Sequence, residues 1–142
     1  MRIPLLKLDV DLPTPSHSHP GDAGTDLYSR IDTELGPGER RTVPTGIAVA
    51  VPAGYAGLVV PRSGLAARQG IGVVNGPGLL DSGFRGEVGV ILVNHGQEPV
   101  AIERGDRIAQ LVVIPVVAQE FVEVDELPPS PRGDGGFGST GR

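Results

Sequence analysis

The sequence contains no cysteine and a single lysine, Lys7. The absence of cysteine excludes disulfides, a thiolate metal site and a thiol nucleophile. Lys7 follows a leucine, so the chain has no glycine-lysine loop of the kind that cradles phosphates in many nucleotide-binding proteins. His17 and His19 have a spacing compatible with metal ligation, but they lie in a loop rich in proline and serine, which disfavours a metal role.

Aromatic residues, positive charge and long apolar runs are also scarce. Aromatic residues make up 4% of the chain, so aliphatic side chains must fill the core. The formal net charge of −5 disfavours duplex nucleic acid as a partner, because such binding needs a positive field. No apolar run is long enough to span a bilayer, and the N-terminus lacks the apolar region of a signal peptide. We therefore expect a cytoplasmic protein with no membrane partner.

The chain is instead rich in turn residues, with 22 glycines and 14 prolines among 142 residues. Turn signals recur about every eight residues, which predicts an all-β protein, a jelly-roll-like β-sandwich or barrel. One short helix is expected over residues 64–68, capped by Ser63 and ended by Gly70. We expect one domain over residues 1–127 and a flexible glycine-rich tail over 128–142. The predicted strands are residues 3–10, 25–29, 47–51, 55–60, 87–93, 99–102, 106–114 and 119–124.

Residues 72–86 form the most informative stretch. Two short apolar pairs flank Asn-Gly-Pro-Gly at 75–78, a pattern that predicts a β-hairpin. The second arm is followed at once by a carboxylate, Asp81, with Ser-Gly and an aromatic residue next to it. Such a carboxylate is placed for chemistry, but a solvated turn aspartate explains the local pattern equally well.

Several other segments have the residue types of an anion site. Arg62 and Ser63 open the predicted helix, where free N–H groups and a forked cation suit phosphate, although a solvated arginine explains them equally well. Asp26, and Gln110 in the strand that follows Asp106, are weaker signals that turn or surface positions also explain. The tail has an arginine and an aromatic ring, as a closing lid needs, or it is an ordinary frayed terminus.

Together these segments resemble, in order, the five motifs of the homotrimeric dUTPases. The matching residues are 23–29, 61–66, 72–86, 105–111 and 132–141, so the resemblance covers nearly the whole chain from Ala23 onward. It implies hydrolysis of dUTP to dUMP and pyrophosphate by attack of water on the α-phosphorus. That activity keeps uracil out of DNA and supplies dUMP for dTMP synthesis.

The resemblance also implies roles for individual residues. Asp81 falls on the catalytic aspartate that activates water, and Asn75 falls on the uracil-recognising position. Phe84 replaces the tyrosine usual in the family, whose ring packs on deoxyribose, so sugar discrimination is expected to survive without the phenol hydrogen bond. The implied substrate-binding residues are Arg62, Ser63, Gly64, Asn75, Leu79, Leu80, Asp81, Phe84, Gln110, Arg132, Phe137, Gly138, Ser139 and Thr140.

The family also uses Mg²⁺, held by the substrate phosphates and water, which implies no direct protein ligand and an outer-sphere role for Asp26. It is trimeric, with each site shared among three subunits. Two alternatives stay open: a dCTP deaminase-like enzyme of the same fold, and a dUTP-binding protein without hydrolysis. Display of the Arg-Gly-Asp tripeptide at 132–134 by an interaction protein is disfavoured, because the chain lacks cysteines and a secretion signal.

Overall fold

A computed structural model describes residues 1–136 of the chain. Ten strands and one short helix make up its regular structure. In chain order they are β1 (Leu5–Lys7), β2 (Gly24–Tyr28), β3 (Thr33–Leu35), β4 (Arg40–Val49), β5 (Tyr55–Pro61), α1 (Ser63–Gln69), β6 (Ile71–Val73), β7 (Gly78–Leu80), β8 (Glu87–Asn94), β9 (Val100–Ile102) and β10 (Arg107–Pro115). Among these residues no helix is long and apolar enough to cross a membrane.

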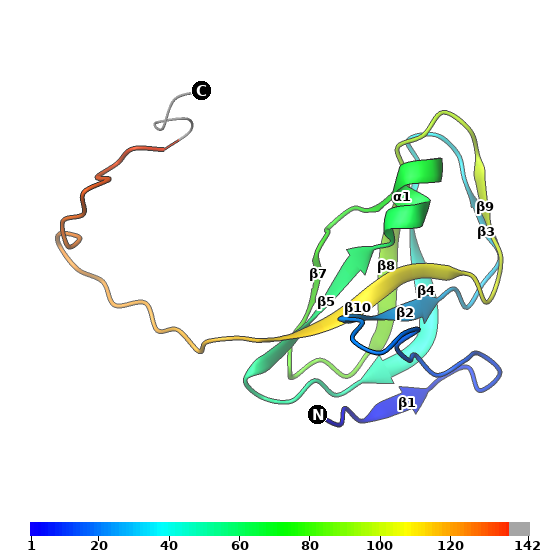
Figure 1. The fold of residues 1–142 in the computed structure, drawn as a ribbon, viewed down its shortest axis with the longest axis horizontal. Helices are drawn as coiled ribbons and strands as arrows, with labels where there is room; N and C mark the ends of the chain where they lie inside the picture. The colour runs from blue at the N-terminus through cyan, green and yellow to red at the C-terminus, as the bar shows by residue number, and fades with distance from the viewer. Residues whose placement is uncertain (137–142) are drawn as a thin grey trace.

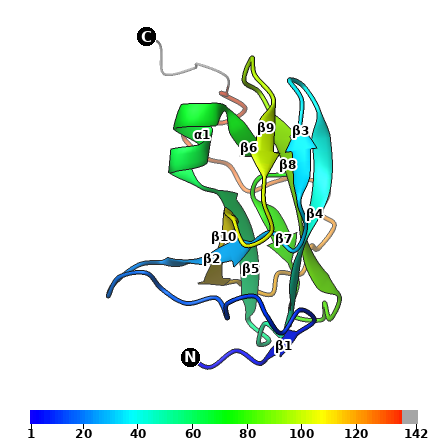
Figure 2. The ribbon, with the colours of Figure 1, turned by 90° about the vertical axis from the view of Figure 1, so that its right-hand side faces the viewer.

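The strands form two four-stranded antiparallel sheets and one small ribbon (Figures 1 and 2). The first sheet has the order β1-β4-β8-β6, and the second has the order β2-β10-β5-β7. The ribbon pairs β3 with β9. The predicted β-sandwich with one short helix is therefore confirmed, whereas β3 was not expected because its three residues contain no alternating pattern.

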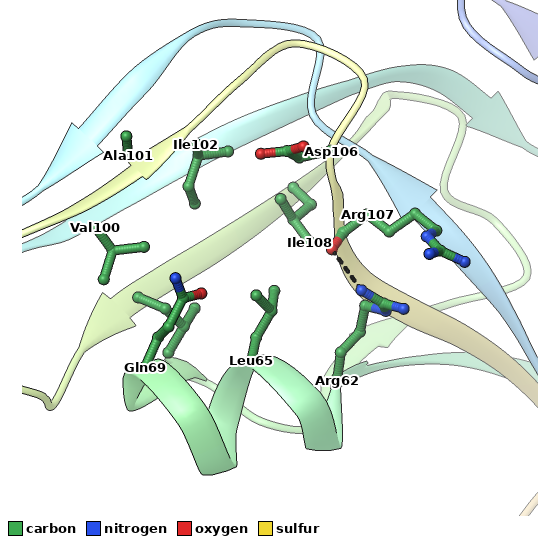
Figure 3. A pocket seen from close by; sticks show the side chains of 10 residues that line it. Arg62, Leu65, Gln69, Val100, Ala101, Ile102, Asp106, Arg107 and Ile108 are labelled. Atoms are coloured by element: carbon green, nitrogen blue, oxygen red, sulfur yellow. Dashed lines mark hydrogen bonds between the residues drawn. The ribbon is translucent and has the colours of Figure 1, made fainter.

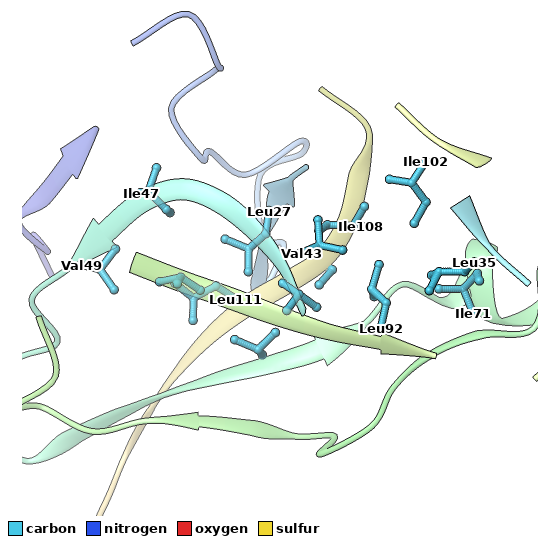
Figure 4. Packing of buried hydrophobic residues seen from close by; sticks show 14 of the residues in the cluster. Leu27, Leu35, Val43, Ile47, Val49, Ile71, Leu92, Ile102, Ile108 and Leu111 are labelled. Atoms are coloured by element: carbon cyan, nitrogen blue, oxygen red, sulfur yellow. The ribbon is translucent and has the colours of Figure 1, made fainter. Parts of the chain in front are cut away.

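Aliphatic side chains from both sheets form the core (Figure 4). In β8, Val88, Val90 and Leu92 are fully buried and alternate with residues that are more exposed, as the period of a strand requires. The second sheet contributes Leu27, Val59, Ile108 and Leu111. The core fills the space between the sheets and so fixes the strands that support the site.

The helix is where the sequence predicted it, but its cap is different. The chain is still extended at Arg62, which is the N-cap residue and makes no side-chain capping bond, so Ser63 already lies in the first helical turn. At the other end Gly70 has the left-handed φ of +71°, and its N–H donates to the carbonyl of Ala66 at 3.0 Å. The predicted glycine stop is therefore confirmed.

The two arms of the predicted hairpin do not pair with each other. β6 pairs with β8 in the first sheet, and β7 pairs with β5 in the second. The reversal between them is a turn, closed by a hydrogen bond from Gly76 N–H to the Val73 carbonyl at 3.0 Å. The hairpin prediction was wrong because each arm has a longer strand as its partner, so the turn joins the two sheets.

The predicted strand over residues 119–124 is also absent. After β10 the chain leaves the sandwich, and the described residues from 117 onward have no strand structure (Figure 1). Val117 and Phe121 are 83% and 92% exposed. The alternating pattern of this segment does not form a strand here because no edge of the same chain lies beside it.

Candidate active site

Three strands bring a group of polar side chains together at the end of the second sheet. β10 lies between β2 and β5, and its Gln110 is level with Asp26 on one side and Val60 on the other. Arg62 follows β5 directly, so it enters the same region from the third strand. The residues are distant in sequence, and the strand register places them next to one another.

Asp26 is the centre of this group. Its Oδ1 lies 3.1 Å from Arg62 Nε and accepts a hydrogen bond from Gln110 Nε2 at 3.4 Å. Its Oδ2 lies 3.4 Å from Arg107 Nη1. Asp26 is only 5% exposed, and Arg62 Nη1 also donates to the Arg107 carbonyl at 3.1 Å. Two guanidinium groups thus share one buried carboxylate, which leaves a net charge of +1 suited to an anion.

Arg107 is a residue that the sequence did not single out. Arg107 and Gln110 are three positions apart, a spacing that places side chains on opposite faces of a regular strand. The register of β10 against β2 shifts between Arg107 and Ala109, and this irregularity allows both side chains to reach Asp26. Asp106, which was expected within the strand, lies just before it and accepts a hydrogen bond from the Glu103 N–H at 2.9 Å.

A cavity of about 230 Å³ lies next to the arginines, between α1, β9 and the start of β10 (Figure 3). Arg62 and Arg107 lie at one end of it in this view, with the hydrogen bond to the Arg107 carbonyl between them. Leu65 and Ile108 contribute apolar surface, and Gln69 lies toward the other end of α1. The cavity is therefore apolar inside and cationic at one end.

A second, smaller cavity lies where the two sheets meet at the turn between β6 and β7. It measures about 60 Å³. The Asn75 side chain lies against Gly78, because a Cβ built on that glycine would be 3.3 Å from Asn75 Nδ2. β7 is the last strand of its sheet, so one edge of its main chain faces away from β5. The cavity is lined by Val59, Val73, Asn75, Gly78, Leu79, Leu80, Gly89, Val90 and Ile91.

Asp81 follows β7 in a tight turn. The N–H of Phe84 donates to the Asp81 carbonyl at 3.0 Å, and Arg85 Nη1 donates to the carbonyls of Ser82 and Phe84, both at 2.7 Å. The Asp81 carboxylate is exposed and has no hydrogen bond or ion pair with another side chain in the part of the chain described. The ring of Phe84 is 41% exposed and covers Gly86, where a Cβ would lie 2.8 Å from the ring.

The structure therefore places the predicted site residues in separate groups. Ser63 and Gly64 lie in the first turn of α1 beside Arg62, and Asn75, Leu79 and Leu80 surround the smaller cavity. Arg132 lies in the tail, away from the sandwich in Figure 1, where its Nε donates to the Gly135 carbonyl at 2.7 Å. The predicted site residues Phe137, Gly138, Ser139 and Thr140 lie outside the described residues.

Away from these groups, Asp9 makes the strongest ion pair of the fold. Its two carboxylate oxygens lie 2.8 and 2.9 Å from Arg104 Nη2, and its Oδ2 lies 3.9 Å from Arg30 Nε. The hydrogen bond from Arg104 lowers the pKa of Asp9 below its ordinary value of 3.8, and the charges of Arg104 and Arg30 act in the same direction. This pair anchors the N-terminal segment to the sandwich.

Fold and geometry together define an all-β sandwich protein with a cationic anion-binding group and a cleft lined by main chain. The sequence profile of the dUTPase family matches residues 10–141. The chain belongs to the dUTPase family.

Curated relatives extend this finding over the full chain. The deoxyuridine 5'-triphosphate nucleotidohydrolase of Thermobifida fusca is 58% identical over 142 residues, which cover 99% of this chain and 79% of the relative. The protein of the same name from Mycolicibacterium gilvum is 58% identical over 96% of this chain and 93% of its own. Among solved structures, a mutant dUTPase of Staphylococcus bacteriophage 80alpha with dUpNHpp is 28% identical, with a TM-score of 0.93 and 99% of both chains covered.

Proposed function

We propose that the chain hydrolyses dUTP to dUMP and pyrophosphate. The observation on which this depends most is the match to the dUTPase family over residues 10–141, because that range includes Asp81 and every described residue of both polar groups. The relatives from Thermobifida fusca and Mycolicibacterium gilvum are named deoxyuridine 5'-triphosphate nucleotidohydrolases. Removal of dUTP keeps uracil out of DNA, and the dUMP formed is the precursor of dTMP.

The smaller cavity is the proposed uracil site. Since β7 is an edge strand, main-chain N–H and C=O groups at Leu79 and Leu80 can pair with the edge of a pyrimidine. Asn75 adds a side-chain amide at the same cavity. Cytosine presents the opposite donors and acceptors, and each main-chain group left unpaired costs about 1–3 kcal/mol. The 60 Å³ found in a single chain is smaller than a base, so binding requires the turn to open or a neighbouring chain to complete the site.

Asp81 is the proposed general base. Its carboxylate is exposed at the end of β7, next to the cavity proposed for the base, so it can hold a water molecule on the 5' side of the nucleotide. Asp81 takes the proton of this water as its oxygen forms a bond to the α-phosphorus. The bond from the α-phosphorus to the bridging oxygen breaks, and pyrophosphate leaves. Phe84 is proposed to pack on the deoxyribose and exclude a 2'-hydroxyl.

The triphosphate is proposed to lie on Arg62, the first turn of α1 at Ser63 and Gly64, and Gln110. Arg62 and Gln110 already lie together around Asp26. The tail is proposed to close over the nucleotide as a lid, with Arg132 on the phosphates, Phe137 on the base, and Gly138, Ser139 and Thr140 as further donors. Closure would exclude water and strengthen each charged contact.

Magnesium is the proposed cofactor, held by the three phosphates and water. The donor set fits this arrangement: no group of three histidine, aspartate or glutamate side chains within residues 1–136 could hold a metal. Magnesium retains its waters and commonly binds to proteins through substrate phosphates. A related phage phi11 dUTPase, 26% identical, has a title that describes coordination of a structural Mg(II) ion. The metal would offset the charge of the triphosphate. Asp26 contributes at most an outer-sphere contact, because its oxygens already accept bonds from neighbouring side chains.

A homotrimer with shared sites is proposed as the working assembly. In support, the segment after β10 is apolar yet exposed, with Phe121, Val122 and Leu127 each more than 70% exposed. Such a segment needs a surface outside its own chain. The fifteen residues after 127 extend on the order of 50 Å, far enough for Arg132 to reach the site of a neighbour.

Pyrophosphate release from a panel of nucleotides tests the proposed function. The protein is expected to release pyrophosphate from dUTP with Mg²⁺ present, and far less from UTP, dCTP and dTTP. Ammonia release from dCTP would instead identify a dCTP deaminase-like enzyme. Binding of dUTP without pyrophosphate release would identify a non-hydrolysing dUTP-binding protein.

A further inference from the structure

Asp26 lies behind the side chains that are proposed to receive the triphosphate. We infer that Asp26 is a positioning residue, which fixes the Arg62 guanidinium and the Gln110 amide in the orientation that binds the triphosphate. The inference depends on the proposed function, because it assigns a role within the same site. It differs from the outer-sphere metal role, since Asp26 acts here through two neighbouring side chains.

The contacts of Arg62 support this role. Arginine has five N–H donors, of which Asp26 engages the one on Nε at 3.1 Å and the Arg107 carbonyl engages one on Nη1 at 3.1 Å. These two contacts hold one side of the planar fork. The three remaining N–H groups have no acceptor within residues 1–136 and form the side available to a phosphate.

The contact with Gln110 has the same consequence. Its Nε2 donates to Asp26 Oδ1 at 3.4 Å, which fixes the direction of the amide. Asp26 itself is rigid: it is 5% exposed, and its main chain pairs directly with that of Gln110 across the β2–β10 ladder. A buried carboxylate on a paired strand is a firm reference point for two longer side chains.

Charge alone predicts the opposite effect of removing Asp26. Arg62 and Arg107 share its single negative charge, so replacing it by a neutral group raises the net charge of the three side chains from +1 to +2. If Asp26 only set the charge of the site, its loss would tighten binding of an anion. If Asp26 positions the donors, its loss lets the two guanidinium groups separate, and binding weakens in spite of the added positive charge.

The test uses the full-length chain and two substitutions at Asp26. Asp26→Asn keeps the shape and loses the charge, and Asp26→Glu keeps the charge and displaces the carboxylate. For both we expect kcat/KM for dUTP to fall about tenfold or more, mainly through KM, because donors that are no longer held in place bind less well. The Mg²⁺ concentration that gives half-maximal rate at saturating dUTP should not change. Asp9→Asn is the matched control, since Asp9 is another arginine-paired aspartate outside the site, and its KM should equal that of the unsubstituted chain.

A third arm measures whether Asp26 acts through Arg62. In an Arg62→Lys background the fork is absent, so Asp26→Asn should cost less than about threefold there, a coupling that two independent residues would not show. Unchanged or lowered KM in both Asp26 variants, an equal loss in the Arg62→Lys background, or a shifted Mg²⁺ requirement with unchanged KM would each overturn the inference.

Failure of the inference is distinguishable from failure of the proposed function. If the unsubstituted chain hydrolyses dUTP and the Asp26 variants match it, the inference fails alone. If the unsubstituted chain releases no pyrophosphate from dUTP, the proposed function fails. Calorimetric titration of the same variants with inorganic tripolyphosphate then decides the role of Asp26. Weaker binding by both variants supports positioning, and equal or tighter binding refutes it.

Discussion

Replacement of Asp81 by asparagine should separate catalysis from binding. The Asp81 carboxylate is exposed and, in the part of the chain described, has no side-chain partner, so Asp81→Asn should change the free energy of unfolding by no more than about 0.5 kcal/mol. The turn around it is held by main-chain bonds and by Arg85, which the substitution leaves intact. The amide can still contact water but cannot accept its proton at neutral pH.

The rate should therefore fall steeply while the nucleotide still binds. Loss of a general base costs about 10²–10⁴ in kcat, which corresponds to about 2.7–5.4 kcal/mol of activation free energy. Pyrophosphate release gives kcat, and calorimetry with a non-hydrolysable dUTP analogue gives the dissociation constant, expected within about threefold of that of the unsubstituted chain. Asp11→Asn, at another exposed aspartate, is the control and should leave both values unchanged. A kcat within threefold of the original, or loss of analogue binding, would refute the role of Asp81 as base.

Three further predictions concern the tail, the sugar and acid stability. Deletion of residues 131–142 should leave the oligomeric state unchanged in light scattering and cut pyrophosphate release at least tenfold, and an undiminished rate would rule out a lid. Phe84→Tyr should change kcat/KM for dUTP only modestly, because packing on the sugar needs only the ring; a large gain in preference for dUTP over UTP would mean that the native ring discriminates poorly. The lowered pKa of Asp9 means that its pairing with Arg104 stabilises the fold above pH 4 and loses this effect as pH falls through the folded pKa. The difference in melting temperature between the unsubstituted chain and Asp9→Asn should thus be present at pH 7 and shrink below pH 4, and a constant difference would contradict this.

The strands were predictable where a buried alternating pattern met clear turn residues. β8 and β10 lie within one or two residues of their predicted bounds, because their branched residues alternate and glycine or asparagine flanks them. Gly70 ended the helix as expected for the same kind of local reason. Local chemistry of this type is contained in a few neighbouring residues, so a sequence reveals it.

Partner choice was not predictable in this way. The Asn-Gly-Pro-Gly turn looks the same whether its arms pair with each other or with two different sheets, and the outcome depends on β5 and β8, which lie elsewhere in the chain. The irregularity between Arg107 and Ala109 likewise has no sequence marker, so the group around Asp26 was only partly foreseen. The strand expected at 119–124 had the right composition, but a strand needs an edge to join.

The smaller cavity shares side chains with the interior of the sandwich. Val59 and Val90 line it and also belong to the buried cluster, where they are 3% and 0% exposed. Its width is therefore set by how tightly the two sheets are stacked, and a methyl group gained or lost deep inside would alter what enters at the surface. Selectivity and thermal robustness in this protein are linked traits, and adaptation of one to a hotter or colder habitat would draw the other with it.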